Sequence, residues 1–129
     1  MVELRNVDGL ATPPGYTHVA TTSAGLVFTA GAVPLDADGE LVGADDPVAQ
    51  ARQVLANLEM QLAAGGATPA DVVKTTVYVA GASHERQGAV WEVVQASPFA
   101  MAPSTLIGVA LLGYRGQLVE VEAIAVIDR

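Results

Sequence analysis

The most regular hydrophobic pattern in the chain is a stripe of apolar residues that recur at the spacing of one helix face. Asp45-Asp46-Pro47 precedes the stripe, and an acidic cap followed by proline is typical of a helix start. Gly65-Gly66 follows it and favours a helix end. The pattern predicts a helix that begins at Pro47 and stops at these glycines. The stripe consists of Val48, Ala51, Leu55, Leu58 and Leu62.

A second, shorter helix is predicted after Ser83, a residue type that often caps helices. Arg86 occupies the third helical position, where a capping box would have glutamate. The segment ends at Ser97-Pro98, because proline does not continue a helix. Its apolar residues are Val90, Trp91, Val93 and Val94.

Segments rich in Val, Ile and Thr predict strands. Elements follow in the order strands, helix, strand, helix, strands, and no linker rich in Pro, Ser or Gly divides them. The pattern indicates a single α+β domain over residues 1–129. The predicted strands are Leu26–Thr29, Val72–Val79, Thr105–Val109 and Leu118–Ile127.

Two of these strands, Val72–Val79 and Leu118–Ile127, are largely apolar on both faces, as in strands covered on both sides. The two predicted helices suffice for one face of the sheet. We expect other copies of the chain to cover the second face, because a large exposed apolar face favours association. The alternative is a monomer whose N-terminal segment folds over the sheet.

Composition narrows the expected partners. Hydrophobic residues make up 51% of the chain and charged residues 16%, which favours self-association. The net charge of −8 includes one lysine, Lys74, so nucleic acid is not an expected partner. The absence of cysteine excludes disulfides and thiolate chemistry. No apolar stretch nears the ~20 residues of a membrane span and no basic start precedes an apolar run, so we expect a cytoplasmic protein without membrane contact.

Two carboxylates stand out in the last predicted strand. Glu120 and Glu122 share one strand face, roughly 7 Å apart, and alternate with apolar residues. Carboxylates in so apolar a strand need partners, because an unpaired buried charge is costly. One interpretation is structural, with Lys74 as a salt-bridge partner, above all for Glu122. The other is functional: an apolar wall raises the pKa of a pocket carboxyl that handles protons.

Five ordered stretches of the chain resemble the RidA/YjgF family of reactive-intermediate deaminases. The first resembles the family's N-terminal Gly-Pro-Tyr turn, the second its strand ending in Ser-Gly-Gln-Ile-Pro, and the others its first helix, the following strand and its last strand. In order they are residues 14–18 (PGYTH), 26–35 (LVFTAGAVPL), 50–58 (QARQVLANL), 71–79 (DVVKTTVYV) and 119–125 (VEVEAIA).

The resemblance implies a chorismate-mutase-like α+β fold, a mixed sheet with two helices on one face. It implies a homotrimer in which three sheets form a barrel inside the helices. In this barrel the sheets of the other two subunits cover the second apolar face of each sheet. Family pockets lie between subunits, bind small molecules and hydrolyse enamines or imines without a cofactor. An activated water attacks the imine carbon and ammonia leaves.

Residue by residue, the resemblance assigns Tyr16 to the pocket wall, the Gly31 backbone to ligand contact and Glu120 to the acid/base role. His18 and His84 match no catalytic position of the family. We expect both histidines on the surface or in loops, and two unlinked histidines do not make a metal site.

The main departure from the family is a missing arginine. Deaminating members carry it in a Pro-Ala-Arg-Ser segment, where its fork grips a substrate carboxylate. Its place here falls on Ser104 or, with a one-residue shift, on Thr105, in residues 102–107 (APSTLI). Ala30 and Ala32 replace the serine and glutamine of the family turn. Arg115 could in principle replace the missing arginine as a cation in the site, but we expect it to be an exposed loop residue.

Two functions follow from this reading. The first is a hydrolase, an imine or enamine deaminase that uses Glu120 and water in an intersubunit cleft, with poor activity on 2-imino acids because the arginine is missing. The alternative is a non-catalytic trimer that binds a small metabolite or serves a regulatory role. Ribonuclease activity conflicts with the net charge of −8.

Overall fold

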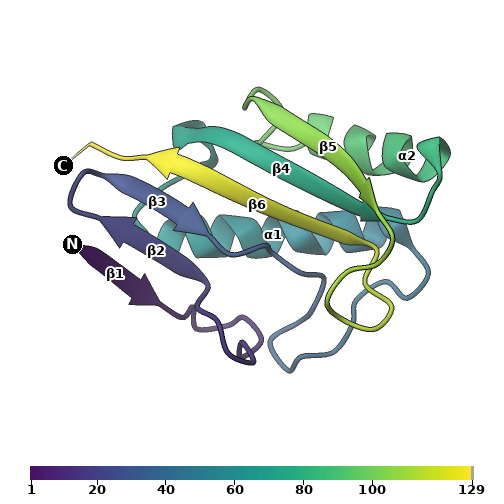
Figure 1. Cartoon of the computed structure of the whole chain (residues 1–129), viewed down its shortest axis with the longest axis horizontal. Coiled ribbons are helices and arrows are strands. Elements are labelled where there is room, and N and C mark those ends of the chain that lie inside the picture. The colour runs from purple at the N-terminus through teal and green to yellow at the C-terminus, as the bar shows by residue number, and fades with distance from the viewer. Residues whose placement is uncertain (129) are drawn as a thin grey trace.

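Six strands form one mixed sheet in the computed structural model, which describes residues 1–128 (Figure 1). The strand order is β1-β2-β3-β6-β4-β5, and every neighbouring pair is antiparallel except β4 and β5, which are parallel. The predicted α+β class and mixed sheet are therefore confirmed. The strands are β1 (Val2–Arg5), β2 (Val19–Thr22), β3 (Leu26–Thr29), β4 (Val72–Ala80), β5 (Ser104–Val109) and β6 (Val119–Val126).

Both predicted helices are present. Helix α1 (Pro47–Ala64) starts with the Asp46 side chain accepting a hydrogen bond from the backbone N–H of Ala49, and it ends at Gly65. Helix α2 (His84–Gln95) is capped by Ser83, which accepts from the backbone N–H of Arg86, as predicted. A short 3-10 turn, Pro69–Asp71, leads into β4. Figure 1 shows both helices on the same side of the sheet, with α2 connecting the parallel strands β4 and β5.

The core lies between the sheet and α1. Alternate residues of the central strands are buried against the helix, as the period of two in a strand requires. The strands contribute Val27, Val77, Val79, Val119, Val121, Ala123 and Ala125. Helix α1 contributes Ala51, Val54, Leu55, Leu58 and Leu62, which include four of the five residues of the predicted stripe.

The opposite face of the sheet is uncovered in a single chain. Phe28 on β3, Ile107 on β5 and Val126 on β6 keep 40%, 39% and 43% of their surface exposed. The segment Val2–Arg5 pairs with β2 at the edge of the sheet instead of crossing this face. The alternative of an N-terminal segment that covers the sheet is therefore wrong.

Candidate functional site

Glu120 lies near the start of β6 and its carboxyl is half-buried. One carboxyl oxygen, Oε1, accepts a hydrogen bond of 3.0 Å from Nε2 of Gln117. The other, Oε2, lies against Gly31: a Cβ added to this glycine would overlap it. Only glycine leaves room for the carboxyl at this position. The structure thus brings together two residues that the sequence assigned to the site.

The segment around Gly31 is held in place by backbone and side-chain bonds. The N–H of Ala32 donates to the Val121 carbonyl at 2.7 Å, which fixes the segment beside β6. On the other side, Nε2 of Gln61 donates to the Ala30 carbonyl at 3.1 Å. Because both neighbours of Gly31 are bonded, its backbone is presented to Glu120 in a fixed orientation.

Tyr16 belongs to the same site. Its hydroxyl lies 3.2 Å from that of Tyr114, and its ring packs edge-on against the His18 ring at a centroid distance of 6.2 Å. Burial raises the pKa of Tyr16, and the bond to Tyr114 and the negative charge of Glu120 act in the same direction. Tyr16, Gly31 and His18 line one small pocket.

The environment of Glu120 favours its protonated form. Burial raises the pKa of its carboxyl, the hydrogen bond from Gln117 lowers it, and the charge of Glu122 raises it. A carboxyl of this kind can exchange protons closer to neutral pH than an exposed glutamate can.

The predicted salt bridge to Lys74 is wrong. In residues 1–128 the only ion pair joins Arg5 to Glu3. Glu122 instead accepts a hydrogen bond of 2.8 Å from the Tyr78 hydroxyl, which raises the pKa of Tyr78 to about 12. Lys74 donates to the Thr105 hydroxyl on the neighbouring strand, because β4 places the two side chains on the same face.

Ser104 and Thr105 lie apart from Glu120 within one chain. Glu120 pairs with Tyr78 on β4, whereas Ser104 pairs with Thr75 on the other side of that strand. The Ser104 oxygen accepts a 2.7 Å bond from the Thr75 hydroxyl. With two strand spacings and three residues between them, the Cα atoms of Ser104 and Glu120 are about 14 Å apart.

The two histidines differ in their surroundings. His18 lies in the loop before β2, as expected, but it is buried rather than at the surface; its Nδ1 accepts a 3.0 Å bond from the backbone N–H of Val7. Burial lowers the pKa of His18, and a bond to the Ala11 backbone partly opposes this. His84 and Arg115 are exposed, as expected.

Five residues of the site were not found from the sequence. Four are buried or half-buried amides that bond backbone atoms around Glu120 and Gly31, and one is the partner of Tyr16. A signal was present for three of the amides, because their spacing of seven and four residues places them on one side of α1. The residues are Gln50, Asn57, Gln61, Gln117 and Tyr114.

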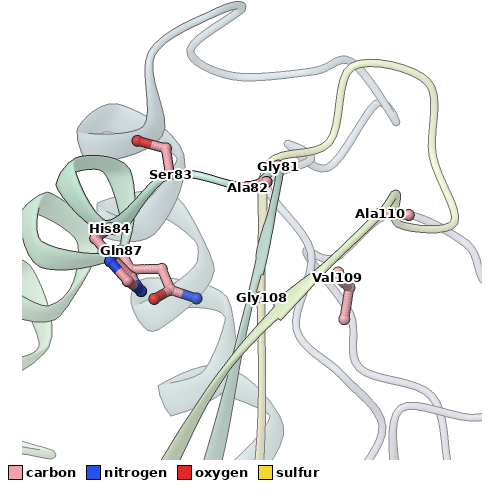
Figure 2. Close-up of a pocket in the computed structure, with 8 residues that line it drawn as sticks. All are labelled: Gly81, Ala82, Ser83, His84, Gln87, Gly108, Val109 and Ala110. Carbon is pink, nitrogen blue, oxygen red and sulfur yellow. The ribbon is translucent and has the colours of Figure 1, made fainter.

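A larger pocket, of about 580 Å³, lies elsewhere, between the start of α2 and the end of β5. Figure 2 shows His84 and Gln87 on the first turns of α2 beside this pocket, facing the strand at Gly108. The titratable residue that lines it is the exposed His84, whereas Glu120 is half-buried with a raised pKa, so we place the candidate acid/base at Glu120.

Residues 1–128 hold no group of three or more His, Asp or Glu side chains arranged to bind a metal ion. Within the same part of the chain, neither helix has the length and apolar character needed to cross a membrane.

The chain resembles known sequences in two comparisons. A sequence model of the family described as Endoribonuclease L-PSP matches residues 8–127. A RutC family protein of Haemophilus influenzae is 49% identical over 55 residues, which are 42% of this chain and 41% of that protein. The chain thus matches less than half of the length of this relative.

Solved structures agree with the sequence matches over nearly the full chain. The YjgF gene product of E. coli is 28% identical, with a TM-score of 0.76, 95% of this chain and 96% of that chain covered. RidA from an Antarctic Psychrobacter is 26% identical, with a TM-score of 0.81 and 96% and 98% covered. Rv2704 of Mycobacterium tuberculosis, a member of the YjgF/YER057c/UK114 family, is 29% identical, with a TM-score of 0.76 and 98% and 100% covered. The chain therefore belongs to the RidA/YjgF family, whose sequence model carries the description Endoribonuclease L-PSP.

Proposed function

We propose that the protein hydrolyses a small imine or enamine at the site of Tyr16, Gly31 and Glu120, and that Glu120 is its acid/base. One observation carries the proposal: the Glu120 carboxyl is half-buried, its pKa is raised, and Oε1 is bonded to Gln117 while Oε2 faces the Gly31 backbone. Such a group is poised to exchange a proton with water or with an imine nitrogen.

The reaction consumes one water and releases ammonia. As carboxylate, Glu120 accepts a proton from a water whose oxygen attacks the C=N carbon. It passes this proton to the nitrogen, which gives a carbinolamine. Glu120 then takes the proton of the new hydroxyl and delivers it to the nitrogen, the C–N bond breaks, and a carbonyl compound and ammonia leave. An enamine first takes a proton on carbon to become the imine. Tyr16, paired with Tyr114, supplies a hydroxyl at the edge of the site to bond the polar end of the substrate.

The substrate class follows from the missing arginine. The hydroxyls that stand in its place are engaged within the chain, Ser104 by Thr75 and Thr105 by Lys74. A neutral hydroxyl contributes about 0.5–1.5 kcal/mol to a hydrogen bond, against about 1.5–3 for a charged donor. We therefore expect 2-iminopropanoate and 2-iminobutanoate to be poor substrates, and imines without a carboxylate to be better ones.

The proposed functional unit is a homotrimer. Within one chain Ser104 and Thr105 do not reach Glu120, and the uncovered sheet face needs a partner. In the trimer that the family resemblance implies, the cleft lies between subunits, and these two residues would enter it from a neighbouring copy. The ligand is a small molecule, and no cofactor takes part.

To test the proposal, the imines are generated in situ by auxiliary enzymes. An amino-acid oxidase supplies 2-iminopropanoate, an amine oxidase supplies the uncharged aldimine of benzylamine, and trapping by semicarbazide reports how fast each imine decays. We expect faster decay of the aldimine in the presence of the protein, and loss of this effect in Glu120→Gln. Glu122→Gln is the matched control: it should keep turnover and change only its pH dependence, because Glu122 is bonded to Tyr78 and its charge raises the pKa of Glu120. If Glu120→Gln dissociates or unfolds the protein, the carboxyl is structural and the catalytic role fails.

A second candidate is a non-catalytic trimer that binds a small metabolite. It is favoured by the engagement of Ser104 and Thr105 within the chain, which leaves the site without the family's carboxylate grip. In that case no imine decays faster with the protein present, and Glu120→Gln changes only the affinity measured by calorimetry.

We do not extend ribonuclease activity to this chain, although the family description contains that word. The 14 acidic residues outnumber the 6 basic ones, and RNA binding needs a basic surface.

A further inference from the structure

We propose that Gln117 is a positioning residue that orients the Glu120 carboxyl and directs its proton to Oε2, the oxygen that faces Gly31. The consequence for catalysis rests on the proposed acid/base role of Glu120. The orientation itself does not.

The bonds of Gln117 fix its amide in one orientation. The side chain is 3% exposed and lies just before β6. Its Oε1 accepts a 3.1 Å bond from the backbone N–H of Tyr114, which can only donate. The amide nitrogen therefore faces Val119 and Glu120, where it donates to the Val119 carbonyl at 3.1 Å and to Glu120 Oε1 at 3.0 Å.

This orientation decides which carboxyl oxygen carries the proton. Oε1 accepts an N–H from Gln117, and the carbonyl oxygen of a protonated carboxyl is a better acceptor than its hydroxyl oxygen, so this bond favours Oε1 as the carbonyl oxygen. The acid form of Glu120 therefore carries its proton on Oε2. Because Oε2 is the carboxyl atom nearest to the position of a Gly31 Cβ, the acidic proton lies on the side of the carboxyl that faces Gly31.

Gln117 also connects the carboxyl to the tyrosine pair. Besides accepting from the Tyr114 N–H, it donates its own backbone N–H to the Tyr114 carbonyl at 3.0 Å. The turn closed in this way carries the Tyr114 ring, whose hydroxyl meets Tyr16. One buried side chain thus sets the positions of both polar groups of the site.

The electrostatic effect of Gln117 opposes that of its surroundings. The titratable groups around Glu120 are Glu122 on the same strand, Tyr78 on β4, and Tyr16 from the N-terminal loop. Burial and Glu122 raise the pKa of the carboxyl, and the Gln117 donor lowers it. Removing the donor should therefore raise this pKa further.

The experiment measures the carboxyl directly, without relying on turnover. Protein labelled with ¹³C at the glutamate carboxyls is titrated by NMR, and the Glu120 resonance is assigned with Glu120→Gln. We expect its midpoint to move upward in Gln117→Leu and in Gln117→Met, two side chains of similar size without a donor. Thr29→Val is the matched control, because it removes bonds to the β6 backbone at Ala123 and leaves Glu120 untouched.

A midpoint that stays in place in both folded Gln117 variants overturns the inference. In the imine assay we expect kcat to fall by roughly tenfold to a hundredfold, the cost of misplacing a reacting group, and the pH profile to shift upward with the midpoint. If the Glu120 midpoint moves in the variants but the wild-type protein does not accelerate imine hydrolysis, the proposed function fails and the inference stands. If the wild type is active and neither midpoint nor pH profile moves in the variants, only the inference fails.

Discussion

At the scale of single residues, the contact between Gly31 and Glu120 shows how space rather than backbone conformation can require glycine. Gly31 is not in the left-handed region that favours glycine elsewhere in the chain. Its missing Cβ instead leaves the volume that the Glu120 carboxyl fills. Any side chain at this position competes with the carboxyl for the same place.

This competition predicts the effect of Gly31→Ala. The added methyl must displace Glu120, so we expect a loss of about 1–3 kcal/mol of unfolding free energy, as in overpacked sites, together with loss of the imine activity. Urea unfolding measures the first effect. In a Glu120→Ala background the same change should cost less, because the conflicting side chain is gone. Gly88→Ala is the control, since open space surrounds that position. If Gly31→Ala cost the same in the wild type and in Glu120→Ala, the prediction would be contradicted.

Part of the site could be predicted from the sequence. The alternation of β6 places Glu120 on the uncovered face, and the family resemblance points to Tyr16 and Gly31. Gln117 and Tyr114 were missed because their bonds reach across a turn, which no periodic pattern encodes. The burial of His18 was not predicted, because the backbone N–H that it bonds, that of Val7, lies eleven residues away in the sequence.

The buried His18 predicts a pH dependence of stability. Its pKa is lowered in the folded state, so the unfolded chain takes up the proton first as pH falls. The stability it contributes is present above about 6.5, the ordinary histidine pKa, and is lost as pH falls through the folded value. Urea unfolding between pH 5 and 8 measures how the free energy of unfolding depends on pH. This dependence should be weaker in His18→Gln than in the wild type. His84→Gln, at an exposed position, is the control and should keep the wild-type dependence of the unfolding free energy on pH. If both variants give the same dependence, the burial of His18 is not its cause.

At the scale of elements, α1 has two roles. Its apolar stripe packs on the sheet, and three buried amides beside that stripe bond the loops around the site. Gln50 donates to the carbonyls of Gly43 and Gly116, Asn57 to those of Val33 and Leu35, and Gln61 to those of His18 and Ala30. The helix thus fixes the segments on both sides of Gly31 and the turn before β6.

The caps and the apolar stripe made α1 and α2 predictable, because both signals are local. Strands β1 (VELR) and β2 (VATT) were missed because they contain fewer bulky apolar residues than β3 (LVFT), and β1 is exposed at all four positions. The central strands were found because both faces are rich in β-branched residues.

The amide bonds of α1 predict a large effect for Asn57→Leu. The substitution keeps the approximate size of the side chain and leaves the carbonyls of Val33 and Leu35 without a donor. We expect a loss of about 2–4 kcal/mol, because unsatisfied buried groups cost about 1–3 kcal/mol each. Gln53→Leu removes only the bond to Asn57 itself and should cost less than about 1.5 kcal/mol. Thermal unfolding compares the two, and equal losses would show that the carbonyl bonds carry no special weight.

At the scale of the whole molecule, the sheet presents one covered and one uncovered face. The uncovered face combines exposed apolar side chains such as Phe28 and Val126 with the Tyr78–Glu122 and Lys74–Thr105 bonds. Helices protect only the other face (Figure 1). An apolar face of this kind favours association with further copies, and the site at Glu120 opens on the same side of β6.

The uncovered face predicts self-association, and the family resemblance implies three copies, so sedimentation equilibrium can test for a homotrimer. We expect a mass of three chains of 13.2 kDa each. Phe28 lies opposite Ile124 in the register of β3 and β6, so Phe28→Asp places a charge at the centre of the apolar part of this face. The variant should shift the mass toward that of one chain, because a buried unpaired charge is costly at an interface. Met60→Lys, on α1 and thus on the helix side, should leave the mass unchanged. A wild-type mass of one chain, or a Phe28→Asp protein with the mass of the wild type, would show that this face is not the interface.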